Sequence, residues 1–154
     1  MFMSKKEIIN ILKNNSNFET RENVIHFEKA LEKLTKIQLS KSDTIELIMI
    51  LDDENPHQEV LWGLLHFIED STNEEIFIKA LFECTQKLLK KAPEWTQLFY
   101  IRLLNNQESR LMLKSMLLKE ESKNYNIIIK IIKGISINES SPLSDYATFV
   151  IQYE

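Results

Sequence analysis

The sequence contains few of the residues that tight turns and crosslinks require. Its 154 residues include two glycines, three prolines and one cysteine. A β-rich fold needs many tight turns, which glycine and proline favour, so this composition argues against one. The single cysteine, Cys84, cannot form an internal disulfide, which fits the reducing cytosol. We therefore expect a helical, cytoplasmic protein.

Long apolar runs are also lacking. The N-terminal residues MFMSKKEIINILK do not contain the apolar run and cleavage site of a signal peptide. The most apolar stretch, residues 127–137, contains Lys130 and Lys133 and is too short to span a bilayer. Apolar residues make up 44% and charged residues 27%, which is typical of a soluble globular protein. We expect a single all-helical domain over residues 1–154 that does not bind a membrane.

Basic residues are missing from one part of the chain, residues 42–78, which we call the acidic block. Residues 1–41 contain eight basic and five acidic side chains, and residues 79–154 contain eleven and eight. All of the net negative charge of −4 therefore comes from the acidic block. Its acidic residues are Asp43, Glu46, Asp52, Asp53, Glu54, Glu59, Glu69, Asp70, Glu74 and Glu75.

Capping signals and apolar spacing predict about eight helices. Capping boxes begin at Ser4 and Thr72, and Asn55-Pro56 has the pattern of an N-cap followed by the first helical residue. Helices are expected near 107–120 and 123–133, the second of them ended by Gly134. The isoleucine-rich residues 127–137 also fit a strand.

A weak internal repeat suggests how the helices are arranged. Pro56 and Pro93 are 37 residues apart, and each precedes an aromatic-rich helix, a polar break and a second amphipathic helix. The same spacing relates Leu61 to Leu98, Trp62 to Phe99 and Leu64 to Ile101. This period favours an all-α fold of antiparallel hairpins, stacked as in an α-solenoid of the HEAT or armadillo kind, over a four-helix bundle.

Residues 57–70, HQEVLWGLLHFIED, contain two histidines, three acidic residues, a tryptophan and a glycine. At about 100° per residue, the leucines and Ile68 fall on one arc of the helix. Glu59, Gly63, His66 and Asp70 form a polar strip on the other side. A glycine inside a helix costs on the order of 1 kcal/mol relative to alanine. We therefore expect either another helix or a partner to approach Gly63.

Enzymatic chemistry has little support. His66 and Glu69 reverse the Glu-x-x-His order of di-iron sites, and neither a His-x-x-x-His motif nor a second cysteine is present. Cys84 lies in an apolar stripe, and the chain has no glycine-rich phosphate loop or nucleophile elbow. We expect no metal, no cofactor and no catalytic residue. Dispersed basic residues and a pI of about 5.5 disfavour nucleic-acid binding.

The acidic block is the main functional signal. A surface of one sign steers an oppositely charged partner, although the same residues also fit a face that is merely solvated. Trp62 and Trp95 fit either interface anchors or core residues. The predicted partner-binding residues are Asp52, Asp53, Glu54, Glu59, Trp62, His66, Glu69, Asp70, Glu94 and Trp95.

Two segments, residues 57–70 and KKAPEWTQLFYIRLLNNQESRLMLK (90–114), resemble the immunity protein 30 family of bacterial polymorphic toxin systems. The resemblance covers about residues 20–120. It implies an all-helical cytoplasmic protein, encoded beside a toxin gene, that binds and neutralises the toxin. Many such toxins are nucleases with basic clefts. The alternative function is that of a helical-repeat adaptor or scaffold that binds a peptide or protein. The matching residues are Trp62, His66, Glu69, Ala92, Pro93, Glu94, Trp95, Arg102, Leu104, Asn105 and Arg110.

Overall fold

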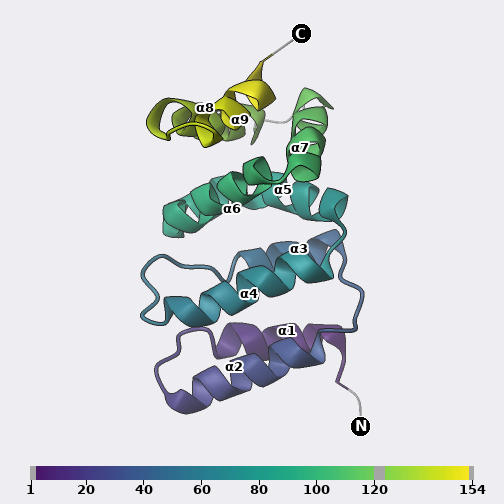
Figure 1. The fold of residues 1–154 in the computed structure, drawn as a ribbon. Helices are drawn as coiled ribbons and strands as arrows, with labels where there is room; N and C mark the ends of the chain where they lie inside the picture. The colour runs from purple at the N-terminus through teal and green to yellow at the C-terminus, as the bar shows by residue number, and fades with distance from the viewer. Residues whose placement is uncertain (1–2, 120–123, 153–154) are drawn as a thin grey trace. The chain divides into compact units, whose positions relative to one another are not determined.

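A computed structural model describes residues 3–119 and 124–152, and these residues form nine α-helices and no strand (Figure 1). The all-α prediction is confirmed, with one helix more than the approximate number expected. The isoleucine-rich run is helical, and the expected boundary at residues 120–123 lies outside the described residues. The helices are α1 (Lys5–Asn14), α2 (Arg21–Lys33), α3 (Lys41–Ile48), α4 (Gln58–Ser71), α5 (Glu74–Lys91), α6 (Pro93–Asn105), α7 (Gln107–Lys119), α8 (Asn124–Asn138) and α9 (Leu143–Ile151).

The chain divides into two compact units, Met1–Leu81 and Phe82–Glu154, with the boundary inside α5. In the first unit, α1 packs on α2 and α3 packs on α4, and the two pairs contact each other through α1–α3 and α2–α4 (Figure 1). Apolar side chains at helical spacing fill the space between these helices, because each helix buries one face. The rings of Phe18 and Phe27 meet edge to face at 5.0 Å between centroids.

In the second unit, α6 contacts α7, α8 and α9, and α9 also contacts α7 and α8. A buried hydrogen bond of 2.7 Å joins the hydroxyls of Thr85 and Tyr100. The Lys114 ammonium donates to the carbonyl of Gln152, at 2.9 Å, and to that of Phe149. A cation at a helix C-terminus satisfies carbonyls that lack a partner within the helix. Lys114 therefore fixes the end of α9 to α7.

Several helix boundaries follow the sequence signals, and one differs because of a local turn. The hydroxyl of Ser4 accepts a hydrogen bond from the backbone N–H of Glu7 at 3.2 Å, which confirms the predicted cap of α1. Pro93 is the first residue of α6. The prediction that Asn55-Pro56 opens α4 is wrong, because α4 begins at Gln58 with His57 as its N-cap. The Asn55 side chain accepts from the backbone N–H of His57 at 2.8 Å and holds a turn before the helix.

Two further predicted boundaries are wrong. The cap of α5 is Asn73, whose side-chain oxygen accepts from the backbone N–H of Glu75 at 2.9 Å. Thr72 is instead the C-cap residue of α4, and its hydroxyl donates to the carbonyl of Ile68 at 2.7 Å. Gly134 does not end its helix, because α8 continues through it to Asn138.

The predicted internal repeat has no clear counterpart in the burial of its related positions. Leu61 and Leu64 are fully buried, whereas the related Leu98 is partly exposed. Trp62 is 38% exposed, whereas the related Phe99 is 1% exposed. The solenoid arrangement therefore stays a prediction. In the part of the chain that the structure describes, no helix has the length and apolarity needed to cross a membrane.

Candidate protein-docking surface

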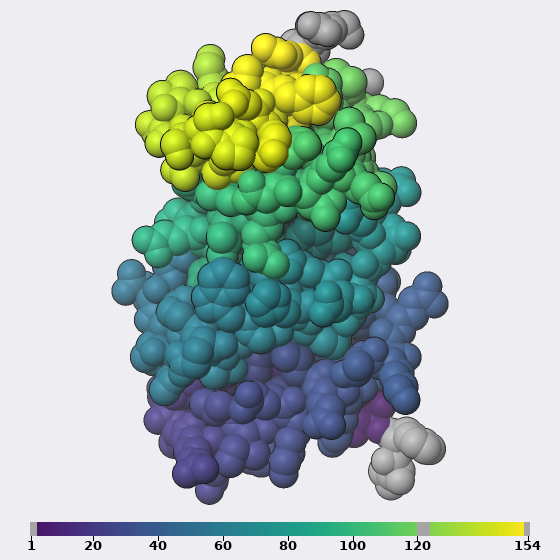
Figure 2. Space-filling view, viewed as in Figure 1, coloured from purple at the N-terminus to yellow at the C-terminus, as the bar shows by residue number. Residues whose placement is uncertain are grey.

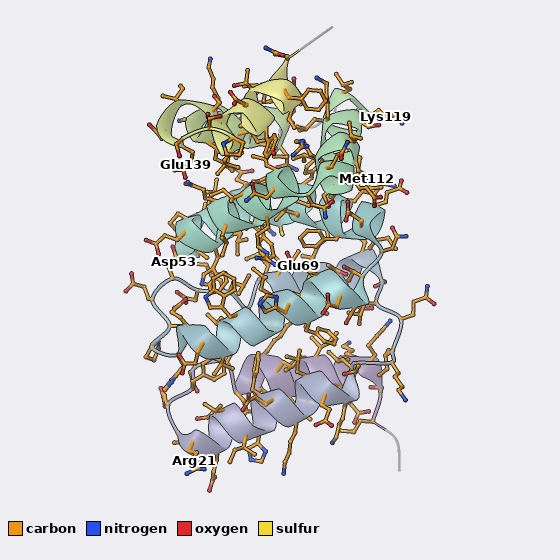
Figure 3. All side chains as sticks on the ribbon, viewed as in Figure 1. Arg21, Asp53, Glu69, Met112, Lys119 and Glu139 are labelled. Carbon is orange, nitrogen blue, oxygen red and sulfur yellow. The ribbon has the colours of Figure 1, made fainter. Side chains whose placement is uncertain are left out.

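The connection between α3 and α4 presents the first three predicted partner-binding residues. The side-chain amide of Gln58 donates to the backbone carbonyls of Asp52, at 3.2 Å, and Asn55, at 2.6 Å. The carboxylate of Asp52 accepts from the backbone N–H of Glu54 at 2.9 Å. These bonds tie the loop to the start of α4. Asp52 and Asp53 are partly exposed and Glu54 is exposed, so the loop carries accessible negative charge (Figure 3).

Part of the acidic block is neutralised by lysines within the first unit. Lys5 pairs with Asp43 at 2.6 Å, and Lys13 pairs with Glu46 at 2.6 Å. Burial alone would raise the pKa of Asp43, but hydrogen bonds from Lys5 and Ser40 outweigh it and hold the pKa below its usual value. Asp43 therefore has a structural role at the start of α3. The unit as a whole still contains fifteen acidic and nine basic side chains.

One face of α4 carries Trp62, His66 and Glu69 at successive turns. The rings of Trp62 and His66 are 5.9 Å apart between centroids, and the His66 Nδ1 lies 3.8 Å from a Glu69 carboxylate oxygen. Trp62 and His66 are exposed, and Glu69 is about one-quarter exposed. Asp70, one residue beyond, is exposed (Figure 3 labels Glu69 on α4). This face combines an aromatic ring with acidic side chains.

Glu59 and His57 lie at the start of the same helix. The Nδ1 of His57 is 3.1 Å from the Glu59 carboxylate. Hydrogen bonds from a backbone N–H and from His57 lower the pKa of Glu59, so its carboxylate is ionised at neutral pH. The carboxylate is exposed and adds negative charge beside the loop before α4.

The second unit contains the last two predicted partner-binding residues. Glu94 is exposed in the first turn of α6, and Trp95 is 5% exposed. A tryptophan this buried contributes to packing, which leaves Trp62 as the accessible aromatic residue of the pair. The other eight predicted residues all lie on α4 or in the connection before it, within the first unit.

A groove between α2 and α4 was not predicted from the sequence. It has a volume of about 300 Å³. Figure 2 shows the side chains of α2 and α4 adjacent on the face of the first unit that is in view. The apolar lining comes from Phe27, Leu31, Val60 and Phe67. Three carboxylates, on Glu28, Glu32 and Glu59, also line it. The sequence signals that could have indicated the groove are Gly63 and the i, i+4 spacing of Glu28 and Glu32. They lie on different helices, so the sequence alone does not show that they meet.

Gly63 also lines this groove. A Cβ placed on Gly63 would meet no atom within 4 Å among the described residues. The alternative that another helix approaches Gly63 is therefore wrong for this part of the chain. The expectation that a partner approaches Gly63 stays a prediction.

A metal cluster and the single cysteine are the two remaining candidates for chemistry at a site. Residues 3–119 and 124–152 contain no cluster of three or more His, Cys, Asp or Glu side chains that could hold a metal ion. Cys84 is buried, and burial raises the pKa of its thiol to about 12, with a smaller contribution from the charge of Glu83. The thiol is therefore neutral and a poor nucleophile near pH 7.

Comparison with known protein families identifies the chain. The sequence description of the immunity protein 30 family matches residues 14–113, which is more than half of the chain and includes α2, α4 and α6. Searches of curated proteins and of solved structures gave no match. Membership of an immunity protein family implies neutralisation of a toxin, and such proteins are typically inhibitors without enzymatic activity. The chain belongs to the immunity protein 30 family.

Proposed function

We propose that this protein neutralises a cognate toxin domain by docking the acidic surface of its first unit against a basic face of that domain. The surface consists of α4 and the connection before it. The net charge of the first unit carries the proposal, because fifteen acidic side chains outweigh nine basic ones in this unit. A one-sign surface accelerates encounter with an oppositely charged partner and excludes partners of the same sign.

Trp62 gives the proposed surface an apolar anchor. Trp62 is 38% exposed, and its ring lies 5.9 Å from that of His66, which in turn lies beside Glu69. Tryptophan is enriched among interface residues that contribute most to binding, where charged neighbours provide specificity. We therefore propose that Trp62 provides much of the binding energy. Glu59, Glu69 and Asp70 would complement basic side chains of the toxin. A nuclease domain with a basic active-site cleft is the kind of toxin that this surface suits.

A peptide-binding adaptor is the second candidate, because the groove between α2 and α4 has an apolar lining. Family membership favours the toxin inhibitor. The two functions differ in what the first unit binds: an adaptor binds a short isolated peptide, whereas an immunity protein requires a folded toxin domain.

Charge reversal on α4 tests the proposal. The double variant Glu69→Lys/Asp70→Lys should keep its helical circular dichroism and bind the toxin domain encoded beside this gene at least about tenfold more weakly. The control Glu108→Lys/Glu139→Lys makes the same change in charge at exposed residues of the second unit. It should bind like the wild type. Equal affinity of both double variants and the wild type would contradict docking through α4.

The ionic strength of the solution provides a second measurement. The association rate constant should fall as salt is added, because screening weakens long-range steering. Co-expression should show the same ranking of variants in protection of cells from the toxin. A rate constant independent of salt would contradict electrostatic docking, even if the protein protects.

A further inference from the structure

We propose that the groove between α2 and α4 is a binding site for one arginine side chain presented by the toxin domain. The inference deepens the proposed function and rests on it. It adds a specific contact, formed by residues of α2 as well as α4, to the acidic surface. Both helices lie within residues 14–113, the part that the family description matches.

The charges around the groove select a cation. Glu28, Glu32 and Glu59 line it, and none of its nine described lining residues is a lysine or arginine. Glu28 and Glu32 are one helical turn apart on α2 and face Glu59 on α4 across the groove. Three carboxylates from two helices can accept hydrogen bonds from a planar, multiply donating cation more fully than one carboxylate can.

The apolar lining favours arginine over lysine or a small cation. Phe67 and Val60 are half-buried, and Phe27 is fully buried beneath the groove. An arginine has an aliphatic stem that packs on apolar surface, and its weakly hydrated guanidinium tolerates aromatic neighbours. A volume of about 300 Å³ suits one or two side chains.

Gly63 has no packing role in the described structure that accounts for it. It lies inside α4, where glycine is unfavourable, and the position of its absent Cβ is open. Gly63 also lines the groove, so any side chain there would extend into the space above the helix. A glycine at this point lets the stem of an incoming arginine lie close to the backbone of α4.

The test fills or neutralises the groove and measures toxin binding by calorimetry. The probe is a catalytically inactive form of the toxin domain encoded beside this gene. Gly63→Gln places a long side chain in the groove and retains a good helix former. Glu28→Gln/Glu32→Gln removes two charges without changing side-chain size. Each variant should raise the Kd about tenfold or more while its circular dichroism stays unchanged.

Matched controls show whether the same substitutions weaken binding when they are made away from the groove. Gly134→Gln makes the same substitution inside α8, where the space around the Cβ position is also open. Glu108→Gln/Glu139→Gln removes two exposed charges from the second unit. Both controls should bind the toxin domain with the affinity of the wild type.

A survey of the toxin domain identifies the occupant. One of its surface arginines, replaced by lysine, should reproduce the loss. Its effect should not add to that of Gly63→Gln, because both changes remove the same contact. If no toxin arginine shows this coupling, the assignment of arginine is wrong.

The outcomes distinguish the groove from the proposed function. If Glu69→Lys/Asp70→Lys weakens binding but the groove variants bind like the wild type, the groove inference fails and the proposed function stands. If the wild type does not bind the toxin domain, both fail. If the groove variants instead change the oligomeric state in light scattering and leave the Kd unchanged, the occupant is a second copy of this chain and the inference is overturned.

Discussion

Replacement of Gly63 by alanine should make the free protein more stable. Gly63 is the sixth residue of α4, well inside the helix, and the added methyl group would meet no described atom within 4 Å. Alanine restricts the unfolded chain and does not require the helix to move. The substitution therefore changes helix propensity with no cost from steric clash.

The expected gain follows from helix propensity alone. Alanine is favoured over glycine inside a helix by about 1 kcal/mol. For a chain of this length, a change of this size raises the Tm by about 2–4 °C. Gly134→Ala is the matched substitution, because Gly134 lies inside α8 and its Cβ position is also open. The two variants should gain similar stability, and the combined variant should gain roughly the sum.

Urea unfolding followed by far-ultraviolet circular dichroism measures the effect. The midpoint should move to higher urea with an unchanged slope, since the surface exposed on unfolding is the same. A lower midpoint for Gly63→Ala alone would refute the reasoning. It would mean that α4 is in closer contact with its neighbours than the open Cβ position indicates, and that the glycine is needed by the fold.

Three further predictions concern other parts of the chain. Cys84, with a thiol pKa of about 12, should resist a thiol reagent in the native protein at neutral pH and react fully once urea unfolds it; rapid native labelling would contradict its burial. Asp43 has a folded-state pKa below its unfolded value of about 3.8, so its contribution to stability is present above that pH and is lost as pH falls through the folded pKa. The gap in Tm between the wild type and Asp43→Asn should therefore shrink as the solution is acidified below about pH 4, and a constant gap would exclude the ion pair with Lys5. Trp95→Ala should cost about 3 kcal/mol or more in urea unfolding, whereas Trp62→Ala should cost less and weaken toxin binding; the opposite ranking would reverse the assignment of core and surface.

Local sequence signals predicted the elements of this fold well. The apolar arc of residues 57–70 is buried as expected, with Leu61, Leu64, Leu65 and Ile68 fully inaccessible to solvent. The cap at Ser4 and the helix start at Pro93 depend only on neighbouring residues and are correct. Errors arose where two local options compete. Asn55 forms a turn with His57 instead of capping α4, and Gly134 is tolerated inside α8 although glycine commonly ends helices.

Contacts between distant residues were not predictable in the same way. A count of charges treats residues 42–78 as uncompensated, but Lys5 and Lys13 come from α1 to pair with Asp43 and Glu46 on α3. The packing of α2 on α4 similarly brings Glu28 and Glu32 to the groove that Glu59 lines. These arrangements depend on which helices pack together, and helical periodicity does not specify that.

Substitutions at Gly63 and Gly134 test whether the groove is a functional surface or a merely solvated one. Exposed acids improve solubility wherever they lie, so their number alone does not imply a partner. A glycine inside a helix is different, because it lowers stability and solubility does not explain it. Gly134 also lies inside a helix and should lower stability by a similar amount, but it lies outside the matched residues 14–113 and does not line the groove. It therefore serves as the control for the effect of a helical glycine on stability alone. If alanine stabilises both positions equally and only substitutions at Gly63 weaken toxin binding, the cost at Gly63 is explained by recognition.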